Sequence, residues 1–345
     1  MSGEVKTKKL FRYKYLLLIG GIIALLVGYF WLSQKQQKSE TFTGPREAVT
    51  IGFLPNTPSS LVFIAEAQEF FSQEGLDVAF KKYSTGKQAL EGMFNKEIDL
   101  AGSGDMGIVF SLFARQDFSI FATIGTSKNE FKIVGRTDTL KRPQDLKGKR
   151  IATAKGTQMN FFLHLFLIKN GLSEKDVEIF FKDAEALPSV LANGEVDAIS
   201  TREPLITSAK RLLSDKAVVF EEPNLFRATL NLIAYKRFIQ DKPEVIRRVL
   251  QALLKAEEFY RIHPEQAMHV VSRKTGVDNS RLASDWTESE LKVSLDQSLL
   301  LTLEDEARWA IKNKFTDKTE VPNYLNFIYQ DGLKAVKAEA VTIIR

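Results

Sequence analysis

A succession of strand and helix patterns that occurs twice is the feature that most constrains the fold of this chain. In the first copy, strands are expected at 49–54, 76–80 and 98–102, separated by a helix from Thr57 to Gly75 and a helix at 86–95. In the second copy, strands at 150–154, 177–181 and 196–201 alternate with a helix from Thr157 to Gly171 and a helix at 184–193. The letters NKEID at 95–99 match NGEVD at 193–197, and Gly75 matches Gly171 at nearly the same offset. We interpret this repetition as an internal duplication that yields two doubly wound α/β lobes.

The remainder of the chain is mostly helical. Helices are expected at about 243–260, 264–275, 279–295, 303–313 and 321–339, and a strand at 229–235 crosses back between the lobes. We therefore predict that lobe 1 combines residues 49–135 and 230–345, and that lobe 2 spans residues 136–229. The crossings near 134–138 and 226–231 would act as hinges. Because doubly wound sheets bind ligands beyond the carboxyl ends of their strands, two facing lobes create a binding cleft.

The N-terminus carries an apolar run of the length that spans a membrane. Residues 16–32 contain no charge and would form a helix about 26 Å long, close to the ~30 Å hydrocarbon core. Five bases precede this run, so the positive-inside rule places residues 1–15 in the cytoplasm. We predict a single-pass anchor in the inner (cytoplasmic) membrane, a polar linker at 33–48, and a periplasmic or extracellular body. A cleaved signal peptide is the alternative, although the run ends in YFWLS and lacks a small-x-small cleavage site.

Composition excludes several classes of function. The 345 residues include no Cys and three His, which excludes disulfides, thiolate metal sites and a Cys nucleophile; we expect no cofactor and no metal. Residues 1–40 hold seven of the 48 bases and two of the 43 acids, so the rest of the chain carries 41 of each. A neutral body argues against nucleic-acid binding. No nucleophile with its base and no paired carboxylates stand out, so we predict that the chain is not an enzyme.

Several segments resemble a family of transport proteins. They are EAQEFFSQEGLD at 66–77, DLKGKRI at 145–151, KGT at 155–157, and GEVDA at 194–198 followed by Glu203-Pro204. In this order they resemble the substrate-binding proteins of ABC transporters in the nitrate, sulfonate and taurine group, which includes thiamine-precursor binders. The resemblance implies a two-lobed type II periplasmic-binding-protein fold over about 49–340. Many members have Trp where this chain has Arg202, which implies a different ligand contact at that position.

Three predicted helix starts, at 57–61, 103–107 and 157–160, each follow a strand and would present free backbone N–H groups to the cleft. Together with the positive ends of the helix dipoles, these groups suit an anion, and helix capping is the alternative for any single Ser or Thr. Asp105 and Glu203 could accept hydrogen bonds, or stabilise a helix start. Arg202 could bind a carboxylate or sulfonate through two parallel guanidinium N–H groups, or it could lie solvated at the rim of the cleft. The predicted ligand-binding residues are Ser59, Ser60, Ser103, Gly104, Asp105, Thr157, Gln158, Asn160, Arg202 and Glu203.

These observations predict an extracytoplasmic solute-binding protein. It would capture a small polar, anionic or sulfonate-like ligand between its lobes by hinge closure. The resemblance implies the permease and ATPase subunits of an ABC importer as partners, and we expect a monomer. Two alternatives remain open: a membrane-anchored ligand-sensing or accessory subunit, and a pyrimidine-precursor binder of the same fold.

Overall fold

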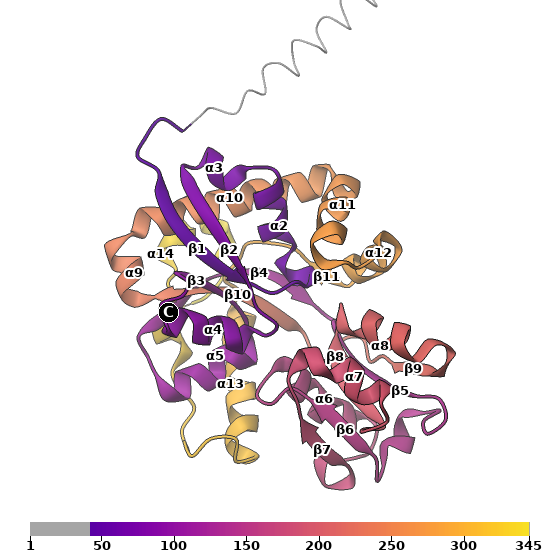
Figure 1. The fold of residues 1–345 in the computed structure, drawn as a ribbon. Coiled ribbons are helices and arrows are strands. Elements are labelled where there is room, and N and C mark those ends of the chain that lie inside the picture. Colours follow the sequence, from indigo (N-terminus) through magenta and orange to yellow (C-terminus); the bar gives the residue numbers. More distant parts are fainter. Residues whose placement is uncertain (1–41, 345) are drawn as a thin grey trace, which may run out of the picture. The chain divides into compact units, whose positions relative to one another are not determined.

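The computed structural model describes residues 42–344. The predicted cytoplasmic segment and anchor at 1–32, and most of the linker at 33–48, lie outside the described residues. Within 42–344, no helix combines the length and apolar character that crossing a bilayer would need. Residues 44–344 belong to one compact unit, and this unit contains two β-sheets (Figure 1).

The first sheet forms lobe 1 and has six strands in the order β11-β4-β10-β3-β1-β2. Strand β1 pairs in parallel with β2 and β3, while β10 runs antiparallel to both β3 and β4. The strands are β1 (Glu47–Phe53), β2 (Leu76–Lys82), β3 (Leu100–Gly104), β4 (Phe118–Ser127), β10 (Ala228–Tyr235) and β11 (Ser289–Glu290).

The second sheet forms lobe 2 and has five strands in the order β7-β6-β8-β5-β9. Strand β6 pairs in parallel with β7 and β8, and β5 runs antiparallel to β8 and β9. The strands are β5 (Phe131–Arg136), β6 (Arg150–Thr153), β7 (Glu178–Phe181), β8 (Ala198–Arg202) and β9 (Ala217–Phe220).

The two sheets repeat one local design. Asp99 accepts a hydrogen bond from the Thr50 backbone N–H at 2.8 Å, and Asp197 accepts one from the Arg150 backbone N–H at 2.9 Å. Asp99 therefore ties the start of β3 to the middle of β1, and Asp197 ties the start of β8 to the start of β6. Gly75 and Gly171 both end helical segments at φ near +72°, a conformation that glycine adopts without steric cost. The structure thus agrees with the duplication that the sequence pattern predicts.

Helices cover both sheets. Around the first sheet lie α2 (Ser60–Ala67), α3 (Phe70–Gln73), α4 (Gly86–Phe94) and α5 (Asp105–Ala114), and around the second lie α6 (Gln158–Lys169), α7 (Leu187–Ala192) and α8 (Leu205–Leu213). Short 3-10 turns are η1 (Thr57–Ser59), η2 (Pro143–Leu146), η3 (Glu174–Asp176), η4 (Ala184–Ala186) and η5 (Ser214–Lys216). The C-terminal elements are α9 (Lys236–Asp241), α10 (Pro243–Ile262), α11 (Pro264–Thr275), α12 (Asn279–Thr287), α13 (Gln297–Lys312), η6 (Tyr324–Phe327), α14 (Asp331–Val336) and η7 (Ala338–Ala340).

Four predicted helices and both crossings differ from the structure. The helix expected from Thr57 to Gly75 is divided into η1, α2 and α3, and the helix expected at 303–313 already begins at Gln297. The helix expected at 279–295 ends at Thr287, because Leu291, Val293 and Leu295 are buried at every second position and form extended chain. The helix expected at 321–339 is only the short α14 between two 3-10 turns. The chain passes between the sheets at 128–130 and 221–227, earlier than the sequence predicted, because β5 already belongs to the second sheet.

Each lobe has its own hydrophobic core, and α13 contributes to both. Leu299, Leu303 and Ala307 lie in the lobe 1 core, whereas Trp309 packs into the lobe 2 core. The Trp309 ring lies 5.1 Å from the ring of Phe161 on α6, edge to face. The end of α13 therefore joins the lobes on one side by aromatic packing.

Candidate functional site

A narrow pocket of about 20 Å³ lies between the lobes. The lining from lobe 1 comes from the end of β3 and the first turns of α4 and α5, and the lining from lobe 2 comes mainly from the first turn of α6 and the end of β8. The lining residues are Leu54, Thr85, Gly86, Lys87, Ser103, Gly104, Gly107, Phe131, Gly156, Thr157, Gln158, Met159 and Arg202. Five of the ten predicted residues meet here: Ser103, Gly104, Thr157, Gln158 and Arg202.

Three helix N-termini face this pocket. Thr85 caps α4 by accepting a hydrogen bond from the Gln88 N–H, Gly104 is the N-cap of α5, and Thr157 is the N-cap of α6. The first N–H groups of a helix have no partner within the helix, and they carry the positive end of its dipole. Three such ends around one pocket favour a negatively charged ligand group.

The α4 terminus is a contribution that the sequence analysis missed. Its first turn packs against the end of β3, where a Cβ on Gly86 would come within 2.8 Å of the Ser103 Cα. Only glycine allows this approach, which brings the Lys87 side chain to the pocket. The signal was present in the letters STGKQ at 84–88, where a capping Thr is followed three residues later by Gln.

Arg202 lies at the boundary between the lobes and is 5% exposed. Its guanidinium donates to the Glu203 carbonyl at 2.9 Å and, across the cleft, to the Ser84 carbonyl at 3.0 Å. Its Nε lies 3.9 Å from the Glu130 Oε1, which also accepts from Asn56 at 2.8 Å. Burial lowers the pKa of Arg202 and raises the pKa of Glu130, while their attraction opposes both shifts. Arg202 is therefore a buried cation, not the solvated rim residue of the alternative interpretation.

Four of the other predicted residues are buried but do not line this pocket. Ser59 donates to the Asn56 side chain at 2.8 Å and Ser60 to the Thr57 carbonyl at 2.5 Å, so both hydroxyls stabilise the η1–α2 start. Asn160 accepts from the Gly156 N–H at 3.4 Å and shapes the turn before α6. Asp105 accepts from the Thr229 N–H and hydroxyl, each at 3.1 Å, and so holds the crossing strand β10.

Behind the pocket, Asp105 forms a buried carboxyl pair with Glu306 of α13. Burial raises the pKa of Asp105, and burial together with the neighbouring Asp105 charge raises the pKa of Glu306 well above its usual range. Neither carboxyl oxygen of Glu306 meets an N–H or hydroxyl donor. A protonated Glu306 that donates to Asp105 accounts for both observations, because a neutral acid avoids a second buried charge.

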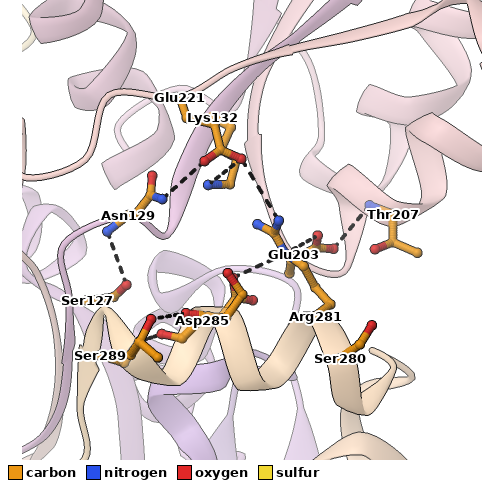
Figure 2. Close-up of polar contacts among 12 residues, drawn as sticks. Ser127, Asn129, Lys132, Glu203, Thr207, Glu221, Ser280, Arg281, Asp285 and Ser289 are labelled. Carbon is orange, nitrogen blue, oxygen red and sulfur yellow. Dashed lines mark hydrogen bonds and ion pairs between the residues drawn. The ribbon is translucent and has the colours of Figure 1, made fainter.

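Glu203, the last predicted residue, belongs to an ionic cluster with Arg281 and its neighbours (Figure 2). Arg281 of α12 reaches from lobe 1 to the Glu203 carboxylate at 3.5 Å and to the Glu221 carboxylate at 3.9 Å, both in lobe 2. It also lies 3.2 Å from Asp285 on its own helix. Lys132, 1% exposed, pairs with Glu221 at 3.0 Å. We name Lys132, Glu203, Glu221, Arg281 and Asp285 the cross-lobe ionic cluster.

Charge in this cluster is unevenly compensated. Burial raises the pKa of Asp285 to about 6, although the Arg281 guanidinium opposes the shift. The nearby carboxylates of Glu203 and Glu130 raise it further, and Lys132 lowers it. Within residues 42–344, no group of three or more His, Asp or Glu side chains is arranged to hold a metal ion. The cluster therefore joins the lobes by ion pairs.

Known structures share this two-lobed arrangement. The alkanesulfonate-binding protein SsuA from Xanthomonas axonopodis pv. citri, bound to MOPS, matches with a TM-score of 0.71 at 19% sequence identity, covering 84% of this chain and 100% of that chain. The fold is thus that of the periplasmic binding proteins. A family model described as NMT1/THI5 like matches residues 56–267, so the chain belongs to the NMT1/THI5-like family. The predicted resemblance is confirmed.

The relatives of this chain include binding proteins, and its structural neighbours include an enzyme. A protein of Bacillus subtilis (strain 168) that is named for aliphatic sulfonate binding is 26% identical over 257 residues, 73% of this chain and 76% of its own length. The desulfurization enzyme DszB matches with a TM-score of 0.60 at 15% identity, covering 84% of this chain and 98% of that chain. The fold alone therefore does not separate binding from catalysis.

Proposed function

We propose that this chain is the solute-binding protein of an ABC importer and that it captures a small organic anion, of the sulfonate class, between its lobes. The observation that carries the proposal is the pocket where the N-termini of α4, α5 and α6 meet beside Arg202. These groups supply N–H donors and positive charge from both lobes, so an anion bound to them stabilises the closed arrangement. The sulfonate class is taken from the relatives, whose names refer to such ligands.

Binding without catalysis is part of the proposal. The polar side chains that line the pocket are two Lys or Arg, two Thr, one Ser and one Gln, and none is a carboxylate or His that could act as a base for a nucleophile. Cys is absent from the whole chain, so a thiol nucleophile is excluded. We also propose that lobe 1 consists of residues 49–135 and 230–345 and that lobe 2 consists of residues 136–229. The observed crossings at 128–130 and 221–227 move these boundaries a few residues toward the N-terminus.

Delivery to a permease requires that the chain stay outside the cytoplasm. We propose that residues 16–32 anchor it in the membrane with the body outside, as a monomer that meets permease and ATPase subunits. The support is the uncharged run and its preceding bases. Intact mass measurement of the protein from its native membrane checks this, and a mature N-terminus between residues 33 and 48 would contradict it.

Thermal unfolding of the full-length chain in detergent tests the binding function. Methanesulfonate, nitrate, acetate and an aminopyrimidine are compared at equal ionic strength, with chloride as the control. A ligand at 100 times its dissociation constant adds about 2.7 kcal/mol, which raises the melting temperature by about 5–10 °C. Stabilisation by methanesulfonate supports the proposal. Stabilisation by the aminopyrimidine alone would favour the pyrimidine-precursor alternative, and no stabilisation by any of the four compounds would contradict both.

A further inference from the structure

A wide groove adjoins the inter-lobe pocket. Its volume is about 480 Å³, much more than the 20 Å³ of the pocket itself. Thr85, Lys87 and Thr157 line both spaces, so the groove and the pocket adjoin at these three residues. One wall is the first two turns of α4 in lobe 1, and the other is formed in lobe 2 by residues 154–157 and 181–184. A ligand whose anionic group lies in the pocket would therefore place its remaining atoms in the groove.

An aromatic side chain faces this groove. Phe181, the last residue of β7, is 41% exposed, whereas most of the large apolar side chains of the described chain are buried. Its ring packs edge to face on Phe315, which follows α13 and contacts the lobe 2 core, with 6.4 Å between the ring centres, and the Lys155 ammonium lies over the ring. An exposed aromatic ring that packs on a second ring is suited to contact a flat apolar group.

The groove is also lined by charged side chains. Lys87 lies 3.9 Å from Glu91 and Lys182 lies 3.7 Å from Glu195, so each has a carboxylate nearby. The Lys155 ammonium lies 5.5 Å from the centre of the Phe181 ring. Glu91 and Asp183 also line the groove, so the charges of its lysines are largely compensated. Because most of these ammonium and carboxylate groups already have a partner of opposite charge nearby, an aminoalkyl tail gains little from them, and the Phe181 ring is the feature that can discriminate between tails.

We propose that this groove is the subsite for the organic tail of the ligand and that Phe181 selects sulfonates with an aromatic tail over those with a methyl or aminoalkyl tail. The inference rests on the proposed function, because it takes the sulfonate group to lie in the inter-lobe pocket. Phe181 is then a specificity-determining residue: it contacts the tail and leaves the anionic group to the helix N-termini and Arg202.

Isothermal titration of the full-length chain with three probes tests the proposal. Benzenesulfonate should bind at least tenfold more tightly than methanesulfonate, which corresponds to about 1.4 kcal/mol, and taurine should bind no better than methanesulfonate. Phe181→Ala should reduce the preference for benzenesulfonate to about threefold or less and leave methanesulfonate affinity unchanged. Phe181→Tyr, which retains the ring, should keep the preference.

Leu301→Ala is the matched control, because Leu301 is a 58% exposed apolar residue outside the groove. It should leave all three affinities unchanged. If Phe181→Ala lost its folded state, Phe181→Leu would replace it, since leucine keeps the apolar volume but not the ring. Equal affinities for benzenesulfonate and methanesulfonate, or an unchanged preference in the Phe181 variants, would overturn the tail subsite while leaving the proposed function intact. Failure of every sulfonate to bind would overturn the proposed function itself.

Discussion

Replacing Arg202 by Ala tests the proposed site most directly, because Arg202 has two separable roles. Its guanidinium lines the pocket, and it also compensates the buried Glu130 carboxylate at 3.9 Å. It further donates to the Ser84 carbonyl of the opposite lobe. The substitution should therefore change both ligand affinity and the free energy of unfolding, by different amounts.

The structure sets the size of each effect. Loss of a buried charged donor to the ligand costs about 2–5 kcal/mol, so the affinity for methanesulfonate should fall by more than tenfold. Breaking a buried ion pair costs about 3–5 kcal/mol, and the long 3.9 Å separation places this pair at the lower end. A loss of about 3 kcal/mol lowers the melting temperature without ligand by about 6–12 °C.

The pH dependence of the stability of Arg202→Ala tests whether Glu130 is the carboxylate that has lost its counter-charge. Burial already raises the pKa of Glu130, and removal of Arg202 raises it further. A carboxyl whose pKa is higher in the folded state than in the unfolded state binds more protons when folded, so its unfavourable effect grows as pH rises through the folded-state pKa. The stability deficit of Arg202→Ala should thus be smaller at pH 5 than at pH 8.

Circular dichroism melts at the two pH values and calorimetric titration with methanesulfonate measure these effects. Arg202→Lys is the control: it keeps the charge beside Glu130 but not the two-pronged geometry, so it should restore most of the stability and part of the affinity. The reasoning fails if Arg202→Ala melts and binds like the wild type. A stability deficit that does not change with pH would show that Glu130 is not the uncompensated group.

The cross-lobe ionic cluster gives two further predictions. Arg281→Gln removes the ion pair from α12 to Glu203. It should increase the ligand dissociation rate by up to about fivefold in stopped-flow measurements, with little change in the association rate. Arg237→Gln is the control, because the Arg237 side chain is 90% exposed and pairs with Asp241 at the surface. Asp285 has a folded-state pKa of about 6, above its usual 3.8, so wild-type stability should fall as pH rises from about 4 to about 6. Asp285→Asn should reduce this fall in melting curves, and an unchanged pH profile would contradict the assignment.

The repeated order of strands and helices could be predicted from the sequence because it depends on local information. Gly75 and Gly171 mark helix ends through their backbone conformation, and Asp99 and Asp197 hold equivalent strand starts. The extended segment at 291–295 was not predicted, for one local and one long-range reason. Its alternating buried residues have the period of a strand but follow directly on a helix, and its partners are distant in sequence, such as Thr123 opposite Ser294.

The pocket was only partly predictable, because sequence reasoning locates helix starts but not the partners of buried charges. Ser103 and Gly104 end strand β3, and Thr157 and Gln158 come shortly after β6, so their place at the ends of strands brings them to the pocket. The carboxylate opposite Arg202 comes from a residue 72 positions earlier, in a segment without a motif. A Lys within the apolar strand FKIV at 131–134 was a signal for a buried ion pair that could have been used.

Arg202 also explains why closure of the lobes can depend on an anion. In this structure its guanidinium already donates to both carbonyls and faces Glu130, so a ligand does not meet a bare cation. If an anion binds as proposed, it replaces the neutral Ser84 carbonyl by a charged acceptor, and charge-assisted hydrogen bonds are about twice as strong as neutral ones. A neutral ligand would gain nothing from this exchange and would lose the contact between the lobes. The Arg202–Ser84 hydrogen bond, one of several contacts between the lobes, is therefore the contact at which an anion and a neutral solute would differ.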